Sequence, residues 1–183
     1  MDDSDFRPII HIIGLPGSGK TTLSKKMARK LKLPIYGVGE YRSKFPMTVY
    51  GEADAWLELF RDLSKQKWRN CILETTGLNR RESFLRVALP PYGIIKIKLE
   101  AKRKILYERI GNKRKGDQGG EWLYSEAYRD KYEFVRKLFK AFKTVPADIR
   151  IDTSAKRPPE VYKIVLKKLE LITPELFNPE HTK

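Results

Sequence analysis

The 183-residue sequence has few of the features that mark exported, membrane or metal-binding proteins. It has one cysteine, Cys71, so no disulfide forms within the chain, and we expect a reducing, cytoplasmic location. One cysteine and two histidines do not supply a zinc cluster. No apolar run approaches the roughly 18 residues of a membrane-spanning helix. The acidic start, Met-Asp-Asp-Ser-Asp, is unlike a leader peptide. We therefore expect no membrane partner, and the sequence indicates no oligomeric state.

Acidic residues are too few to balance the basic ones. The chain has 38 Lys and Arg against 23 Asp and Glu, which gives a net charge of +15. Much of the excess lies in residues 96–143, which hold 15 basic and 7 acidic residues. Such a charge attracts nucleic acids, nucleotides, phosphorylated metabolites and anionic lipids. With 40% hydrophobic residues, we expect a folded domain that binds polyanions.

Strand-like and helix-like segments alternate along the chain. Short apolar runs predict strands at 9–13, 35–38, 71–73, 94–99 and 149–151. Apolar residues at helical spacing predict helices at 21–31, 53–67, 80–88, 103–110, 122–142 and 160–171. This alternation predicts an α/β fold, with a five-stranded parallel sheet and helices on both faces. We expect a single domain over 1–172 and a tail, 173–183, in which Leu176 and Phe177 are the residues able to dock on the core.

The first expected strand leads into the most specific motif of the chain. The segment Gly14-Leu-Pro-Gly-Ser-Gly-Lys20-Thr21 is G-x-x-x-x-G-K-[ST] between a strand and a helix. Its glycines allow several backbone N–H groups to face one anion, and the helix start adds the positive end of its dipole. The motif predicts ATP and Mg²⁺ as ligands, with Lys20 on the outer phosphates and the Thr21 hydroxyl on the metal. The expected ATP-binding residues of this segment are Gly14, Gly17, Ser18, Gly19, Lys20, Thr21 and Thr22.

With this motif, the chain resembles the small P-loop kinases of the adenylate kinase-like and polynucleotide kinase-like group. The resemblance extends over roughly residues 9–170. It implies transfer of the ATP γ-phosphate to an acceptor. It also implies an acceptor-binding insert at about 40–68 and a mobile, arginine-rich lid at about 103–121.

The segment that follows the second expected strand resembles two groups of kinases. Gly37-Val-Gly-Glu-Tyr-Arg42 is similar to the segment after the P-loop in fructose-6-phosphate 2-kinase domains. Polynucleotide 5′-hydroxyl kinases have a similar Asp-Asp-Tyr-Arg. The resemblance implies that Arg42 binds a phosphate of the acceptor. Glu40, two residues before it, becomes a candidate general base.

A second carboxylate ends the third expected strand. Glu74 lies where a P-loop site needs another anchor for Mg²⁺, usually through water. Related kinases read Asp-Ala-Thr-Asn-x-x-Arg here, which implies that Thr76 and Arg80 bind the acceptor. Glu74 is thus a candidate for metal binding, for the general base, or for both, and the choice of base between Glu74 and Glu40 stays open.

Two further segments resemble the family's nucleotide-binding loops. Arg109 and the basic run around Arg114 are similar to the end of a helix in polynucleotide kinases. The family lid places arginines along the transferred phosphoryl group, whose transition state spreads negative charge over its oxygens, so both arginines are expected to be catalytic. The loop from Asp152 to Arg157 resembles the adenine-side loop, which implies that these two residues bind ATP.

The charge distribution points to a nucleic-acid or nucleotide acceptor. The expected helix at 122–142 carries the basic residues Arg129, Arg136 and Lys140 on one side, with Lys143 just after it. The hydroxyl acceptor would be a polynucleotide 5′ end or a hydroxymethylated base in DNA. The alternative is a small-molecule kinase for a nucleoside monophosphate or a sugar phosphate. A non-catalytic nucleotide switch is a third hypothesis, although residues 112–117 do not form the base-reading Asn-Lys-x-Asp of GTPases.

Overall fold

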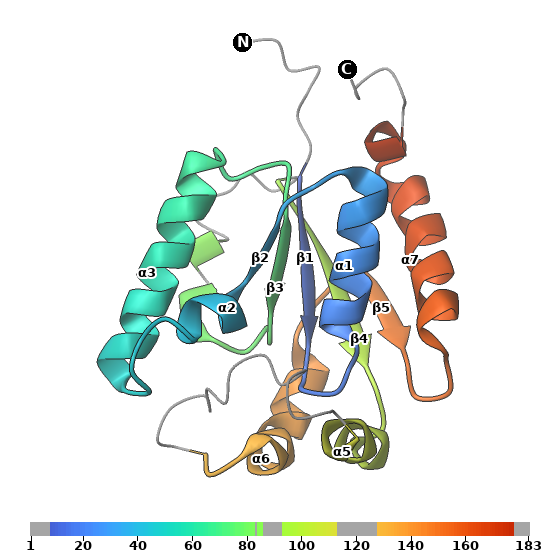
Figure 1. Ribbon diagram of the computed structural model, residues 1–183. Coiled ribbons are helices and arrows are strands. Elements are labelled where there is room, and N and C mark those ends of the chain that lie inside the picture. Colours follow the sequence, from blue (N-terminus) through green and yellow to red (C-terminus); the bar gives the residue numbers. More distant parts are fainter. Residues whose placement is uncertain (1–7, 83, 86–92, 113–127, 178–183) are drawn as a thin grey trace.

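The computed structural model describes residues 8–82, 84–85, 93–112 and 128–177, and they form one parallel sheet with helices around it (Figure 1). The sheet has five strands in the order β2-β3-β1-β4-β5. The predicted α/β fold is confirmed. The strands are β1 Ile9–Gly14, β2 Ile35–Gly37, β3 Ile72–Thr75, β4 Ile94–Glu100 and β5 Ile149–Asp152.

The helices cover both faces of the sheet and also the ends of its strands. They are α1 Lys20–Leu31, α2 Val38–Arg42, α3 Val49–Lys65, α5 Arg103–Gly111, α6 Lys131–Thr144 and α7 Pro158–Ile172, with 3₁₀ turns at Arg80–Glu82 and Pro174–Phe177. Helices α1 and α7 pack with Ile10 and Ile12 on one face. On the other face, Ile9 packs with α2 and α3, and Ile13 packs with α5 and α6. This alternation along β1 explains why every residue of the strand is buried and why four of the six are isoleucine.

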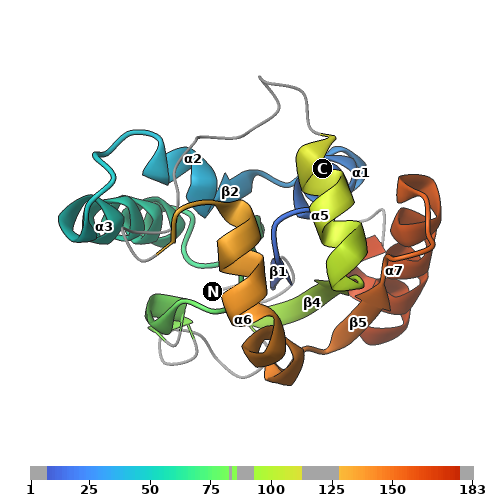
Figure 2. The ribbon, with the colours of Figure 1, turned by 90° about the horizontal axis from the view of Figure 1, so that it is seen from below.

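The parallel register brings the carboxyl ends of the strands together at one edge of the sheet. Thr75 of β3 pairs with Ile13 of β1, and Glu74 pairs with Gly37 at the end of β2. Figure 2 shows this edge from below, with α5 and α6 lying across it and α1 partly hidden behind α5. Ligands of open α/β sheets bind at such an edge. The fold therefore places the phosphate-binding loop, Glu74 and α2 beside one another.

Several element boundaries differ from the predicted ones because a local cap decides them. The helix predicted over 122–142 begins at Lys131, since the Asp130 carboxylate accepts a hydrogen bond of 2.7 Å from the backbone N–H of Glu133. Its predicted first residues, 122–127, lie outside the described ranges. Helix α3 begins at Val49, before the predicted residue 53, because the Thr48 hydroxyl caps it.

Two other predicted segments differ in part from the prediction. Val38, predicted as the end of a strand, begins the short helix α2. The helix predicted over 80–88 starts as the 3₁₀ turn at 80–82, residues 84 and 85 are helical as predicted, and residues 83 and 86–88 lie outside the described ranges. Leu176 docks on the core as expected, beside α7. Among the described residues, no helix is both long and apolar enough to cross a membrane.

Candidate active site

The conformation of the phosphate-binding loop requires glycine at several positions. Gly17 and Gly19 have φ angles of 81° and 96°, which side-chain-bearing residues rarely adopt. A Cβ on Gly17 would lie 2.7 Å from the Leu106 carbonyl oxygen of α5, and a Cβ on Gly14 would collide with the Ser18 hydroxyl. The loop therefore packs directly on α5. The Ser18 Oγ is buried inside the loop without a hydrogen-bond partner.

The start of α1 is open to an anion. Its N-cap is Gly19, no side chain caps it, and its first turn contains no acidic residue. Its backbone N–H groups and dipole therefore favour a bound phosphate. The Lys20 ammonium lies back over the loop and donates to the Leu15 carbonyl at 3.3 Å. This arrangement fits the phosphates of a nucleotide.

Thr21 and Glu74 meet at the strand ends. The Thr21 hydroxyl donates a hydrogen bond of 2.7 Å to Glu74 Oε1, although the two residues are 53 positions apart. A hydroxyl and a carboxylate are both oxygen ligands of the kind that Mg²⁺ prefers. In the described part of the chain, no three His, Cys, Asp or Glu side chains form a metal-binding group. The hydroxyl and the carboxylate fit a Mg²⁺ ion that takes its other ligands from nucleotide phosphates and water, as such ions usually do.

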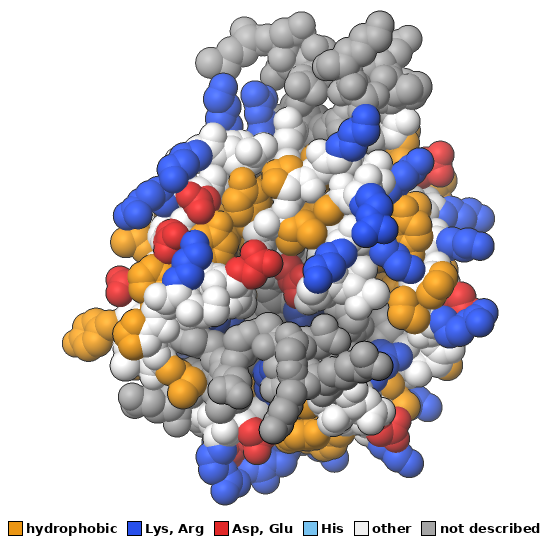
Figure 3. Space-filling model, viewed as in Figure 1, with side chains coloured by type: hydrophobic (Ala, Val, Ile, Leu, Met, Phe, Trp, Pro, Cys, Tyr) orange, Lys and Arg blue, Asp and Glu red, His pale blue; other side chains and the backbone are white. Residues whose placement is uncertain are grey.

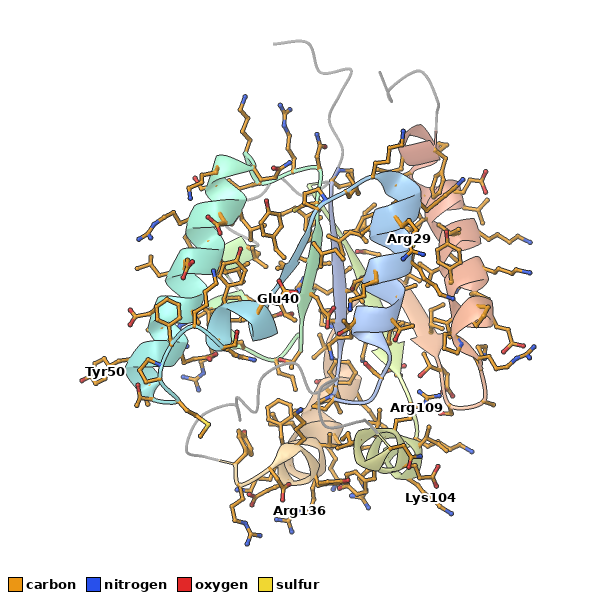
Figure 4. The ribbon with its side chains drawn as sticks, viewed as in Figure 1. Arg29, Glu40, Tyr50, Lys104, Arg109 and Arg136 are labelled. Atoms are coloured by element: carbon orange, nitrogen blue, oxygen red, sulfur yellow. The ribbon has the colours of Figure 1, made fainter. Side chains whose placement is uncertain are left out.

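Glu40 follows the carboxyl end of β2, the strand that pairs with β3 beside Glu74. It is in α2, directly after the Gly37 that pairs with Glu74, and Figure 4 shows it facing the space between α2 and α1. Of the two candidate bases, Glu74 contacts Thr21 directly after the loop, and Glu40 follows the end of the neighbouring strand β2. Figure 3 shows acidic side chains at the centre of the face seen in Figure 1, with Lys and Arg side chains both directly beside them, over α1, and around the edges.

The predicted acceptor residue Arg42 has a buried partner. Its Nε and Nη2 donate to the Glu52 carboxylate at 2.8 and 2.7 Å, and only 4% of Arg42 is exposed. Glu52 Oε1 also accepts from the Trp56 indole at 2.8 Å and from the Asn79 amide at 2.9 Å. These contacts connect α2, α3 and the turn after β3. Sequence reasoning missed Glu52, although it lies within the predicted insert.

Arg109 is held by a residue that sequence reasoning also missed. Its guanidinium donates to the Thr153 hydroxyl at 3.0 Å and to the Thr153 carbonyl at 2.6 Å. The buried Thr153 hydroxyl also lies 3.3 Å from the Ser18 carbonyl and 3.0 Å from the Glu100 carbonyl. Thr153 therefore connects α5, the phosphate-binding loop and the loop after β5. Its position directly after Asp152, in the loop that resembles the adenine-side loop of the family, is the sequence signal that could have indicated it.

The remaining predicted residues occupy the surroundings of the site. Asp152 ends β5 and accepts from the Ser154 N–H at 2.8 Å; the hydrogen bonds from Ser154 lower the pKa of its carboxyl. Arg157 is the exposed N-cap residue of α7 and lies 3.6 Å from Glu160. Thr22 is exposed on α1, Thr76 is buried after β3, and Arg80 is exposed in the 3₁₀ turn. Arg114 lies outside the described ranges. The roles of all these residues stay predictions.

A buried polar network supports the turn after Glu74. His11 Nε2 lies 2.8 Å from the Thr75 hydroxyl, and the Gly77 N–H donates to that hydroxyl and to Glu82, each at 3.1 Å. Burial, with a smaller contribution from Lys96, lowers the pKa of His11 to about 3. His11 is therefore a neutral member of the core.

The shifted pKa of His11 predicts acid sensitivity. An exposed histidine titrates near pH 6.5, so between about pH 3 and 6.5 the unfolded chain binds the extra proton. Stability should thus fall with decreasing pH in this window, by up to about 1.4 kcal/mol per pH unit from this group. Denaturant unfolding from pH 7 to 4 should show a shallower decline for His11→Gln. Subtracting the two curves largely removes the contribution of Glu82, whose pKa burial raises. Parallel curves would contradict the prediction.

Comparison with known proteins finds one curated relative and many solved structures of similar fold. No protein-family model matches the chain. Over 117 residues it is 31% identical to a cytidylate kinase from Pyrobaculum calidifontis, an alignment that covers 56% of this chain and 58% of that protein. The chain thus aligns with little more than half the length of this curated relative.

Solved structures resemble the chain over most of its length. A shikimate kinase from Acinetobacter baumannii in complex with shikimate has a TM-score of 0.64 and 18% identity, over 93% of this chain and 95% of that one. A sugar kinase from a Janibacter species has a TM-score of 0.63 and 16% identity, over 92% and 98%. A thymidylate kinase from Candida albicans has a TM-score of 0.60 and 16% identity, over 93% and 94%. The chain therefore has the fold of small P-loop kinases.

Proposed function

We propose that this protein is an ATP-dependent kinase that acts on a small acceptor of the sugar, nucleoside or nucleotide type. The 2.7 Å contact between Thr21 and Glu74, beside an uncapped helix start after a G-x-x-x-x-G-K-T loop, is the observation that carries the proposal. These features would hold the phosphates and the metal of Mg·ATP. A reducing, cytoplasmic location remains part of the proposal.

Each residue near the strand ends has a role in this proposal. Lys20 and the loop N–H groups hold the phosphates of ATP, and Thr21 and Glu74 would hold Mg²⁺. When bound, Mg²⁺ neutralises charge on the phosphates. When the acceptor group is a hydroxyl, Glu40 or Glu74 accepts its proton as it attacks the phosphoryl group. Arg109 fixes the loop after β5 beside the nucleotide through Thr153.

The comparisons favour a small acceptor over the nucleic acid that the charge suggested. The relative with 31% identity is named a cytidylate kinase, and the similar structures include sugar, shikimate and thymidylate kinases. We therefore rank a small-molecule acceptor, including the nucleoside monophosphate and sugar phosphate considered from the sequence, above a polynucleotide 5′ end or a hydroxymethylated base.

A nucleic-acid acceptor is the second candidate, favoured by the net charge of +15. Arg136 of α6 is exposed and projects away from the sheet in Figure 4. However, Arg129, Arg136 and Lys137 all lie within 4 Å of the Glu133 carboxylate. The Arg129 N–H first, and then Lys137, lower the pKa of Glu133 to about 2, so this carboxylate stays ionised at neutral pH. Its negative charge offsets part of the positive charge with which α6 would bind a nucleic-acid strand.

Radiolabel transfer from γ-labelled ATP tests the function. The panel would hold sugars, sugar phosphates, nucleosides, nucleoside monophosphates, 5′-hydroxyl oligonucleotides and oligonucleotides with hydroxymethylated bases. We expect label on a small acceptor, with an affinity that depends weakly on salt. An oligonucleotide acceptor would instead lose affinity by roughly 10² between about 50 and 200 mM salt, and Arg136→Gln with Lys140→Gln would flatten that slope. Salt-dependent transfer to an oligonucleotide would reverse our ranking of the two acceptor classes. Binding of ATP without transfer to any acceptor would favour a nucleotide switch.

A further inference from the structure

We propose that Glu52 determines acceptor specificity, by neutralising Arg42 and so selecting an acceptor that places no phosphate on that arginine. This inference rests on the proposed kinase function and narrows its acceptor class to sugars, nucleosides or similar hydroxylated molecules. It assigns a role to a residue outside every motif recognised in the sequence.

The contact between Arg42 and Glu52 is a complete ion pair. Two neighbouring nitrogens of the guanidinium, Nε and Nη2, face the two carboxylate oxygens at 2.8 and 2.7 Å. The side chains are only 5% and 10% exposed. A side-on, bidentate pair of this kind is the geometry in which arginine would otherwise bind a phosphate. Glu52 therefore occupies the edge of Arg42 that a phosphate would need.

Glu52 is also held in place by partners other than Arg42. Its Oε1 accepts hydrogen bonds from Trp56, four residues along α3, and from Asn79, in the turn after β3. If Glu52 moved away to release Arg42, the buried Trp56 indole N–H would lose its hydrogen bond to Glu52 Oε1. If Arg42 left instead, a buried carboxylate would lose its charged partner, which is strongly unfavourable. Because either movement is unfavourable, a phosphate does not readily replace Glu52 as the partner of Arg42.

Titration with inorganic phosphate tests the inference without knowledge of the natural acceptor. The donor site is first saturated with a non-hydrolysable Mg·ATP analogue, and phosphate binding is then measured by calorimetry. We expect weak binding to the wild type and at least tenfold tighter binding to Glu52→Gln, which removes the charge but keeps an oxygen for Trp56 and Asn79. The matched control is Glu58→Gln, which breaks an exposed pair with Lys44 on the same helix and should leave phosphate binding unchanged. Wild-type binding as tight as that of Glu52→Gln would overturn the inference.

A second variant keeps the test meaningful if Glu52→Gln alone disturbs the fold. Arg42→Gln combined with Glu52→Gln removes both charges and leaves two amides that can pair. Whatever its overall rate, its ratio of activity on a nucleoside to activity on the 5′-monophosphate should stay within about threefold of the wild type. A selective loss of the phosphorylated acceptor by tenfold or more would show that Arg42 binds phosphate. Since the phosphate titration does not depend on turnover, failure of the kinase proposal and failure of this inference give different results.

Discussion

Lys20→Ala is expected to lower phosphoryl transfer by on the order of 10² or more. The reason is the position of one positive charge at the phosphate-binding loop, where Lys20 follows Gly19 and its ammonium lies over the Leu15 carbonyl. In the reaction, that charge would stabilise negative charge that develops on the transferred phosphoryl group. Steady-state transfer from γ-labelled ATP to the best acceptor of the panel measures the effect.

The matched control for this prediction lies one and a half turns further along the same helix. Lys25 is exposed on α1, so Lys25→Ala removes an equal charge away from the loop. It should keep the rate within about twofold of the wild type. If Lys20→Ala retained a near wild-type rate, the loop would not be part of the active site.

Glu40→Gln and Glu74→Gln are expected to affect different kinetic parameters. If Glu40 is the base, Glu40→Gln should lower kcat by roughly 10² to 10⁴ while Mg·ATP binding is kept, because only proton transfer is lost. Glu74→Gln should raise the Mg²⁺ concentration needed for half-maximal activity, because the carboxylate beside Thr21 loses its charge. Rates measured over a Mg²⁺ titration, at saturating ATP and acceptor, separate the two roles.

The outcome also decides the base that the sequence left open. A large loss of kcat in Glu74→Gln at saturating Mg²⁺, with little change in Glu40→Gln, would assign the base to Glu74. Equal and small effects of both substitutions would contradict both roles. Asp54→Asn, an exposed carboxylate of α3, is the control for removal of a negative charge.

Features encoded in short stretches of sequence were predicted well. The five strands follow from apolar runs that end at glycine or at polar residues, and burial on both faces of the sheet makes such runs continuous. The phosphate-binding loop follows from glycines that side chains cannot replace, as the positive φ of Gly17 and Gly19 shows. Boundaries were predicted less well, because a cap such as Asp130 outweighs apolar spacing at the start of a helix.

The sequence alone determined the succession of strands and helices along the chain and the phosphate-binding loop, because both depend on neighbouring residues. It also determined the place of Glu74 beside that loop, because the carboxyl ends of parallel strands share one edge of the sheet. Only the tertiary structure decided the partners of the two arginines. Arg42 pairs with Glu52, which Asn79 also contacts from 27 positions away, and Arg109 binds Thr153 from 44 positions away. A motif states which charge is present, whereas the packing of distant elements decides whether that charge is available to a ligand or is already neutralised.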